Sequence, residues 1–124
     1  MLFQYTDAFV TLAAADAETL VWFYRQLLDQ EPKPYIPNVY AEFHLTGLRL
    51  GIFQPQPTHL EEFVNSMLSG MSLCLEVDNL EDAIAHLTGI GYPPPGEIMT
   101  ASHGLEIYAY DPAGNRLILH QSHA

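Results

Sequence analysis

The sequence contains the same order of patterns twice, and this repeat limits the possible folds more than any other feature. Each copy begins with a short apolar strand, continues with an amphipathic helix and ends with a β-hairpin. The first copy takes up about residues 1–53 and the second about residues 71–124, with a connection at 54–70. This duplicated β-α-β-β-β unit predicts an α+β fold, in which a cupped, open, barrel-like mixed sheet surrounds a cavity and carries its helices on the outside.

The helix of each copy is predicted from a capping residue and an apolar stripe. Asp16 is a suitable N-cap for the first helix, and apolar side chains recur at helical spacing from Leu20 to Leu28. In the second copy, a strand from Met71 to Val77 turns through Asp78 into a helix, with Glu81 three residues further on in a capping-box-like arrangement. These two helices would each bury one face against a sheet.

Two hairpins follow from alternating side chains around turn residues. The first pairs residues 40–45 with 48–53 around Thr46 and Gly47, where glycine supplies a positive φ. The second pairs residues 105–110 with 116–121 around the sequence Asp-Pro-Ala-Gly-Asn, which is typical of a turn. We expect a short extra element near Ile98 and a weakly helical segment at 59–68.

The composition excludes several classes of protein. A net charge of -11, with only four basic residues, argues against binding to nucleic acids or to anionic membranes. The single cysteine, Cys74, excludes an intrachain disulfide and a cysteine-rich zinc site. No apolar run is long enough to span a membrane, and the first residues do not resemble a signal peptide, so we expect one domain located in the cytoplasm.

Three segments together resemble the glyoxalase/bleomycin-resistance/dioxygenase superfamily, also called the vicinal oxygen chelate superfamily. They are Trp22-Phe23-Tyr24 in the first helix, residues 75–82 at the start of the second, and the Asp-Pro-x-Gly-Asn turn with its following strand at 110–119. The resemblance implies the paired β-α-β-β-β modules and a homodimer. Because members include lyases, epimerases, dioxygenases, thiol transferases and metal-free drug-binding proteins, the fold does not select a function.

The metal-binding positions of that superfamily are occupied by other residue types in this chain. The resemblance places the four ligands at Phe9, Gly51, Ser72 and Ile118. None offers an imidazole or a carboxylate, and a hydroxyl alone binds divalent metals poorly. We therefore expect no cofactor, no divalent metal bound in stoichiometric amount by the purified protein, and no metal-based Lewis-acid chemistry.

Strand alternation predicts which side chains line the cavity, because every second residue points to the same face. The predicted ligand-binding residues are Tyr40, Glu42, His44, Arg49, Phe53, Cys74, Glu76, Glu106, Tyr108, Tyr110, Arg116 and His120. They mix aromatic rings with a few charges, as small-molecule sites do. Structural roles are the simpler explanation for some of them, since Glu106 and His120, or His44 and Arg49, can be cross-strand pairs. The family also places a loop beside the cavity mouth at His103, which makes that residue a weaker candidate.

Two functions of different classes remain open. The first is a metal-independent protein that binds a small ligand in an aromatic and charged cavity, as bleomycin-resistance proteins do. The alternative is a glyoxalase-like lyase, isomerase or dioxygenase-type enzyme that uses Glu106 or Glu42 with His120 or His44 as acid and base. A third possibility is a relocated metal site built from the same four residues. The missing metal ligands favour the first.

Overall fold

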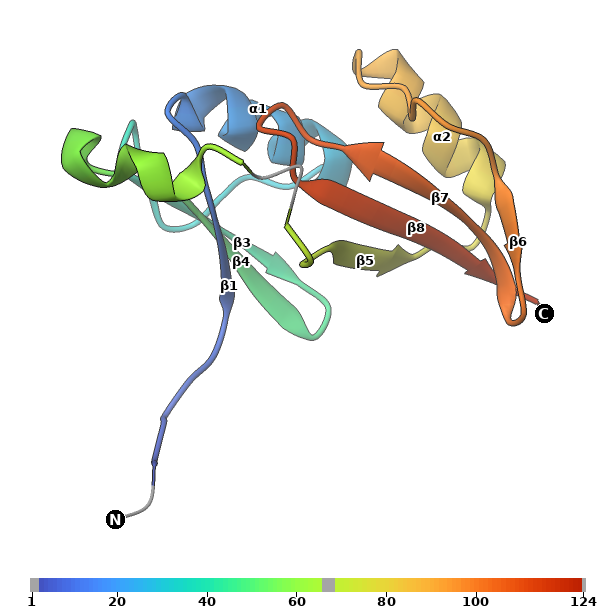
Figure 1. Cartoon of the computed structure of the whole chain (residues 1–124), viewed down its shortest axis with the longest axis horizontal. Coiled ribbons are helices and arrows are strands. Elements are labelled where there is room, and N and C mark those ends of the chain that lie inside the picture. The colour runs from blue at the N-terminus through green and yellow to red at the C-terminus, as the bar shows by residue number, and fades with distance from the viewer. Residues whose placement is uncertain (1–2, 66–68, 124) are drawn as a thin grey trace.

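The two halves of the chain form two four-stranded sheets in a computed structural model that describes residues 3–65 and 69–123 (Figure 1). The first half contains β1 (Val10–Ala13), α1 (Ala17–Leu28), β2 (Tyr35–Ile36), β3 (Tyr40–Leu45) and β4 (Leu48–Phe53). The second half contains β5 (Leu73–Glu76), α2 (Leu80–Gly89), β6 (Met99–Ala101), β7 (Gly104–Tyr110) and β8 (Arg116–Ser122). Between them lies the 3-10 helix η1 (Pro57–Phe63). Each half thus has the predicted order β-α-β-β-β.

The two sheets have the same topology, with strand orders β1-β4-β3-β2 and β5-β8-β7-β6. In each sheet the first strand pairs parallel with the last strand of the same half, and the other neighbours are antiparallel. Neither sheet closes on itself, so β1 and β5 are edge strands. This open, mixed arrangement confirms the predicted fold class.

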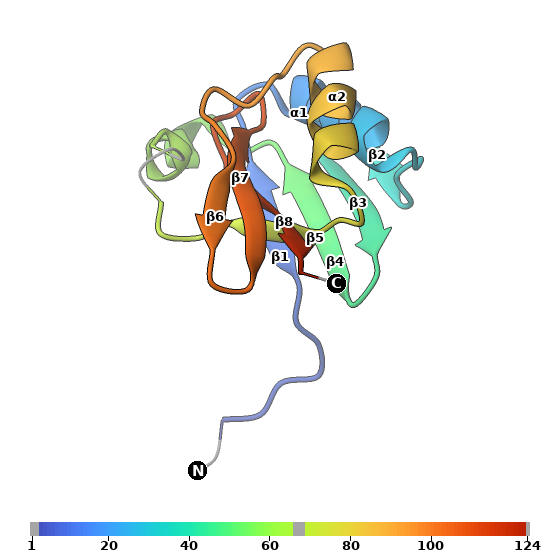
Figure 2. The ribbon, with the colours of Figure 1, turned by 90° about the vertical axis from the view of Figure 1, so that its right-hand side faces the viewer.

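The helices α1 and α2 lie on one side of the sheets, and the shared hydrophobic core lies between them and the strands (Figure 2). The buried cluster draws on both halves, and its largest members include Tyr24, Phe23 and Phe43. Apolar side chains at alternate strand positions, such as Leu50 and Leu117, supply the sheet side of this core. No helix in the described residues is long and apolar enough to cross a membrane.

The turn at 111–115 joins the halves. Asp111 accepts hydrogen bonds from the backbone N–H groups of Ala113 and Asn115, each at 2.9 Å, and from the Asn115 side chain at 2.8 Å. Its second oxygen also accepts a 2.7 Å bond from the hydroxyl of Tyr24 on α1. Burial raises the pKa of Asp111 despite these donors, and burial beside that carboxyl raises the pKa of Tyr24 well above its usual value.

Some predicted boundaries differ from the structure. The side chain of Asp16 caps α1 as predicted, but α2 is capped by Asn79, which accepts a bond from the N–H of Asp82, and not by Asp78. Strand β5 is shorter than the predicted stretch 71–77, and β2 was not predicted. The helical segment expected at 59–68 is a 3-10 helix at 57–63, while residues 66–68 lie outside the described chain.

Candidate functional site

The predicted site residues lie on the strand faces that turn away from the core, which agrees with the alternation in the sequence. Ala41, Phe43, Ile107 and Ala109 are buried in the core, whereas their neighbours along β3 and β7 are not part of it. Hydrogen bonds gather the polar members in three places. One lies on the first sheet, one on the second, and one in a cavity between β1 and β5.

On the first sheet, the buried carboxylate of Glu42 holds three side chains together. Tyr40 donates its hydroxyl to Glu42 at 2.9 Å, and Arg49 Nη1 lies 3.6 Å from the same carboxylate. His44 Nε2 lies 3.1 Å from Glu42 and 3.0 Å from the carbonyl oxygen of Lys33, so this nitrogen carries a proton. Burial and the bond to Glu42 raise the pKa of Tyr40. The capacity of Glu42 to accept further bonds is largely used within this group.

Arg49 is also satisfied by neighbours outside the sheet. It forms an ion pair with Asp7, and its guanidinium lies 4.8 Å from the ring centre of Phe9. Because its charge is already balanced by two carboxylates and its face lies against an aromatic ring, Arg49 is poorly suited to bind a ligand anion.

On the second sheet, Glu76 orients His120. The Nδ1 atom of His120 lies 2.6 Å from Glu76, while the other carboxylate oxygen accepts bonds from Ser122 N at 2.9 Å and Ser122 Oγ at 2.7 Å. The hydrogen bonds from Ser122 lower the pKa of Glu76 most, and the bond from His120 lowers it further. Glu106 is the register partner of His120, as predicted, but the carboxylate that accepts a hydrogen bond from His120 is that of Glu76 on β5.

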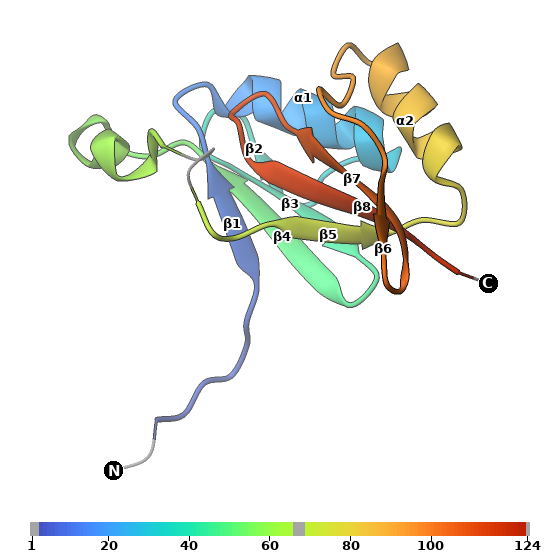
Figure 3. The same cartoon turned by 45° about the vertical axis from the view of Figure 1, so that its right-hand side comes forward.

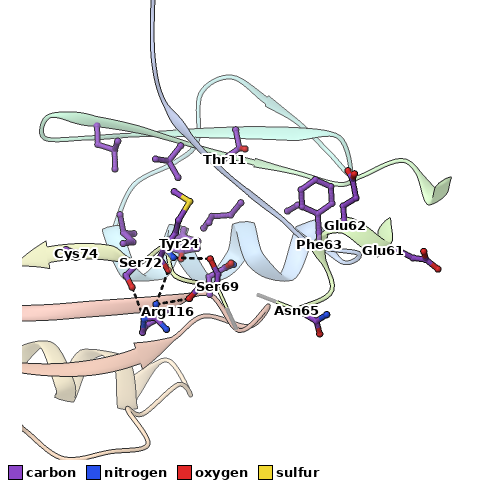
Figure 4. A pocket seen from close by; sticks show the side chains of 17 residues that line it. Thr11, Tyr24, Glu61, Glu62, Phe63, Asn65, Ser69, Ser72, Cys74 and Arg116 are labelled. Atoms are coloured by element: carbon purple, nitrogen blue, oxygen red, sulfur yellow. Dashed lines mark hydrogen bonds between the residues drawn. The ribbon is translucent and has the colours of Figure 1, made fainter. Parts of the chain in front are cut away.

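The third place is a cavity of about 400 Å³ bordered by β1, β5, Tyr24 and η1 (Figure 4). Two predicted residues line it, Arg116 and Cys74. The guanidinium of Arg116 donates to Ser72 Oγ at 2.7 Å and to the carbonyl oxygen of Ser69 at 2.9 Å (Figure 4). No ion pair holds Arg116 within residues 3–65 and 69–123, in contrast to Arg25 and Arg49.

The remaining aromatic candidates lie elsewhere. Tyr108 and Tyr110 line a separate hollow together with Ile98 and Met99. Phe53 packs edge to face against Phe63 of η1, with 5.4 Å between ring centres. The structure therefore does not gather all twelve predicted residues in one cavity of this chain.

Other groups fill the positions at which the resemblance places metal ligands. Gly51 lies under Tyr40, since a Cβ there would be 2.7 Å from the Tyr40 hydroxyl. Ser72 accepts the bond from Arg116. Ile118 on β8 has an aliphatic side chain and is the register partner of Cys74 on the neighbouring strand β5. These residues do not fit the superfamily's metal centre, because they offer neither imidazole nor carboxylate groups.

Sequence reasoning gave little weight to two residues that the structure makes prominent. His103 stacks on His120, with ring centres 4.6 Å apart. In the sequence, the only signal for a role of His103 is its position beside a loop glycine. The sequence pattern identifies Asp111 only as a turn residue, although its carboxylate also accepts a hydrogen bond from Tyr24 on α1. A hydrogen bond between residues 87 positions apart cannot be seen in a local pattern.

Several solved structures superpose on nearly the whole chain. A glyoxalase/bleomycin resistance protein from Catenulispora acidiphila superposes with a TM-score of 0.68 at 21% identity, covering 96% of this chain and 100% of that one. A bleomycin-binding protein in complex with bleomycin superposes with a TM-score of 0.64 at 20% identity, with the same coverage of both chains. The fosfomycin resistance protein FosX from Listeria monocytogenes superposes with a TM-score of 0.75 at 14% identity, covering 98% of this chain and 96% of FosX.

The chain has the fold of the glyoxalase/bleomycin-resistance/dioxygenase superfamily. The resemblance inferred from the helix, strand and turn motifs is confirmed at this level. No family model and no curated protein matches the sequence. At these identities the shared fold does not carry ligands or reactions from one protein to another, so the function has to be argued from this chain's own residues.

Proposed function

We propose that the protein binds a small molecule, without the metal centre of the superfamily, in the cavity between β1 and β5. The observation that carries the proposal is Arg116, a guanidinium held in place by neutral oxygens at the wall of a 400 Å³ cavity. Small-molecule sites commonly combine such a cavity with a few fixed polar groups. The fold's occurrence in a bleomycin-binding protein supports a binding role.

The lining of the cavity indicates the class of ligand. Val10, Leu12 and Leu73 offer apolar surface, and Phe63 adds an aromatic ring on the side of η1 (Figure 4). Arg116 is the basic side chain among the lining residues and can donate further hydrogen bonds to an oxyanion. A molecule with an aromatic or aliphatic body and one acidic group matches this arrangement. Glu61 and Glu62, also in the lining, would oppose a second acidic group at the other end.

The first test uses 1-anilinonaphthalene-8-sulfonate, a fluorescent aromatic sulfonate, as the probe. We expect saturable binding to one site per chain, with equal affinity in the presence and absence of EDTA. Arg116→Gln should weaken binding about ten- to 100-fold, which is the effect of losing a hydrogen bond to a charged group. Chemical shift changes in an NMR titration should centre on Thr11 and Cys74, which line the cavity.

Arg49→Gln is the matched control, because it removes the same charge from the equivalent hairpin but from an arginine outside the cavity. It should leave the affinity for the probe unchanged. Equal affinity of the Arg116→Gln variant and the wild type, or loss of binding with EDTA, would contradict the proposal.

We further propose a homodimer, because among the described residues one edge strand of each sheet beside the cavity, β1 or β5, has no neighbouring strand on its outer side (Figure 3). Unpaired strand edges in stable proteins are usually covered, shortened or blocked. The location in the cytoplasm that was expected from the sequence stays a prediction, as does the absence of nucleic-acid and membrane partners.

A further inference from the structure

We propose that His103, Glu106 and His120 bind one divalent transition-metal ion, Zn²⁺ being the best match, on the second sheet. The site is separate from the cavity lined by Arg116 and does not coincide with the superfamily positions Ser72 and Ile118. It goes beyond the proposed binding function. A metal here would be a second, independent feature of the protein.

The three side chains come from adjacent parts of one sheet. Glu106 on β7 and His120 on β8 are cross-strand register partners, and His103 lies in the turn that leads into β7. One potential ligand atom from each of them lies within 4.8 Å of the other two. Ligands on a tetrahedral zinc ion lie about 3.4 Å apart for bonds of about 2.1 Å. Rotation of the exposed His103 side chain and of the Glu106 side chain toward His120 can shorten the distances between the ligand atoms to this value.

The hydrogen bonds of His120 make it a prepared ligand. Glu76 accepts a hydrogen bond from the Nδ1–H group of His120 at 2.6 Å, so the neutral ring has a free lone pair on Nε2. This Nε2 atom is buried and has no hydrogen-bond partner within the described residues. A buried acceptor without a partner is costly, and a metal ion is one way to satisfy it. A carboxylate that fixes the opposite nitrogen is the usual second-shell partner of a metal-binding histidine.

The neighbouring backbone leaves no room for a side chain other than glycine beside His120 Nε2. A Cβ atom at Gly104 would lie 2.9 Å from His120 Nε2 and 2.1 Å from the carbonyl oxygen of Gln121. Glycine at this position therefore allows the β6–β7 turn to approach β8 closely. It also brings the ring of His103 over that of His120 at 4.6 Å.

The donor set determines the class of metal. Two imidazoles and one carboxylate suit Zn²⁺, Fe²⁺, Co²⁺ or Ni²⁺, whereas Mg²⁺ and Ca²⁺ prefer oxygen ligands alone. Three protein ligands also leave a tetrahedral ion one position for water. The site would thus discriminate against the abundant alkaline-earth ions.

The test is a titration of the EDTA-treated and dialysed full chain with ZnCl₂ by calorimetry, repeated with CoCl₂ by visible absorption. We expect one ion per chain, a cobalt spectrum of low coordination number and no heat with MgCl₂. His103→Ala and His120→Ala should each abolish binding or weaken it at least about 100-fold. Glu76→Gln, which changes only the orienting carboxylate, should weaken it about ten- to 100-fold. Circular dichroism would check that each variant is folded.

His44→Ala is the matched control, because His44 also lies beside a glutamate on a hairpin strand, in the first sheet. It should leave zinc and cobalt binding unchanged. The proposal is wrong if the folded wild type takes up no zinc at one equivalent, if binding survives both His103→Ala and His120→Ala, or if His44→Ala removes it equally. Since the fluorescent probe is proposed to bind in the Arg116 cavity, failure of the metal site would leave the proposed binding function standing.

Discussion

At the scale of single residues, the bond between Tyr24 and Asp111 connects α1 to the turn of the second half. Tyr24 is fully buried, and its hydroxyl is one of the donors on the Asp111 carboxyl group. Tyr24→Phe should lower the free energy of unfolding by about 1.5 to 3 kcal/mol, because a hydrogen bond to a charged group is lost in a buried place. Urea denaturation followed by circular dichroism measures this change.

Tyr92→Phe provides the comparison for this prediction. The ring of Tyr92 also packs against Phe23, with 5.2 Å between ring centres, but its hydroxyl has no hydrogen-bond partner among the described residues. Its replacement should change stability by much less. Similar losses in both variants would mean that the Tyr24 hydroxyl contributes little to joining the halves.

At the scale of secondary-structure elements, the two helix caps differ in one useful respect. Asp16 and Asn79 both accept a bond from the backbone N–H three residues on, at 3.2 and 2.9 Å, but only the aspartate titrates. Replacement of either by alanine should cost about 1 kcal/mol at neutral pH. The hydrogen bonds from Thr19 lower the pKa of Asp16 below its unfolded value of 3.8.

A lowered pKa in the folded state means that the stabilisation by Asp16 is fully present above pH 3.8 and is lost as the pH falls through the folded pKa. The cost of Asp16→Ala should therefore shrink between about pH 5 and pH 2, whereas the cost of Asn79→Ala should stay constant. Urea denaturation of the wild type and both variants across this range checks the prediction. A pH-independent cost for Asp16→Ala would show that its carboxylate charge does not matter.

The elements also show how far the sequence could predict the structure. Alternation along β3, β4, β7 and β8 correctly separated core from outer-face residues, because the side-chain period of a strand is fixed. The two-residue strand β2 has no detectable period, and a one-residue shift between Asp78 and Asn79 as cap leaves almost the same pattern. The hydrogen bond from His120 to Glu76 depends on parallel pairing of β5 with β8, which no local signal specifies.

The site was less predictable than the fold for a related reason. Face alternation placed Arg116 and Cys74 on the correct strands, but the cavity that they line depends on how β5 lies relative to β1 and η1. Likewise, His103 joins Glu106 and His120 only because the glycine turn brings β6 and β7 close to β8. Both features arise from packing between segments that are distant in the sequence.

At the scale of the whole molecule, the exposed strand edges and apolar side chains favour a second copy of the chain. The far edge strands, β2 and β6, are only two and three residues long, whereas β1 and β5 have four residues each. Short edges resist further pairing, so the edges of β1 and β5 are the more suitable for an interface. Next to them lie Phe9, 46% exposed, and Met71, 69% exposed.

We therefore expect light scattering at micromolar concentration to give twice the chain mass of 13.9 kDa. Phe9→Glu should shift the protein toward a monomer, because a charge beside β1 would be desolvated in the interface. Ile36→Glu is the control, since Ile36 is 53% exposed on β2 at the opposite edge and should leave the dimer intact. A wild type that stays monomeric, or a dimer that only Ile36→Glu dissociates, would contradict this interface.

Because Val10, next to Phe9, lines the Arg116 cavity, dissociation should also change the affinity for the fluorescent sulfonate, which links assembly to ligand binding.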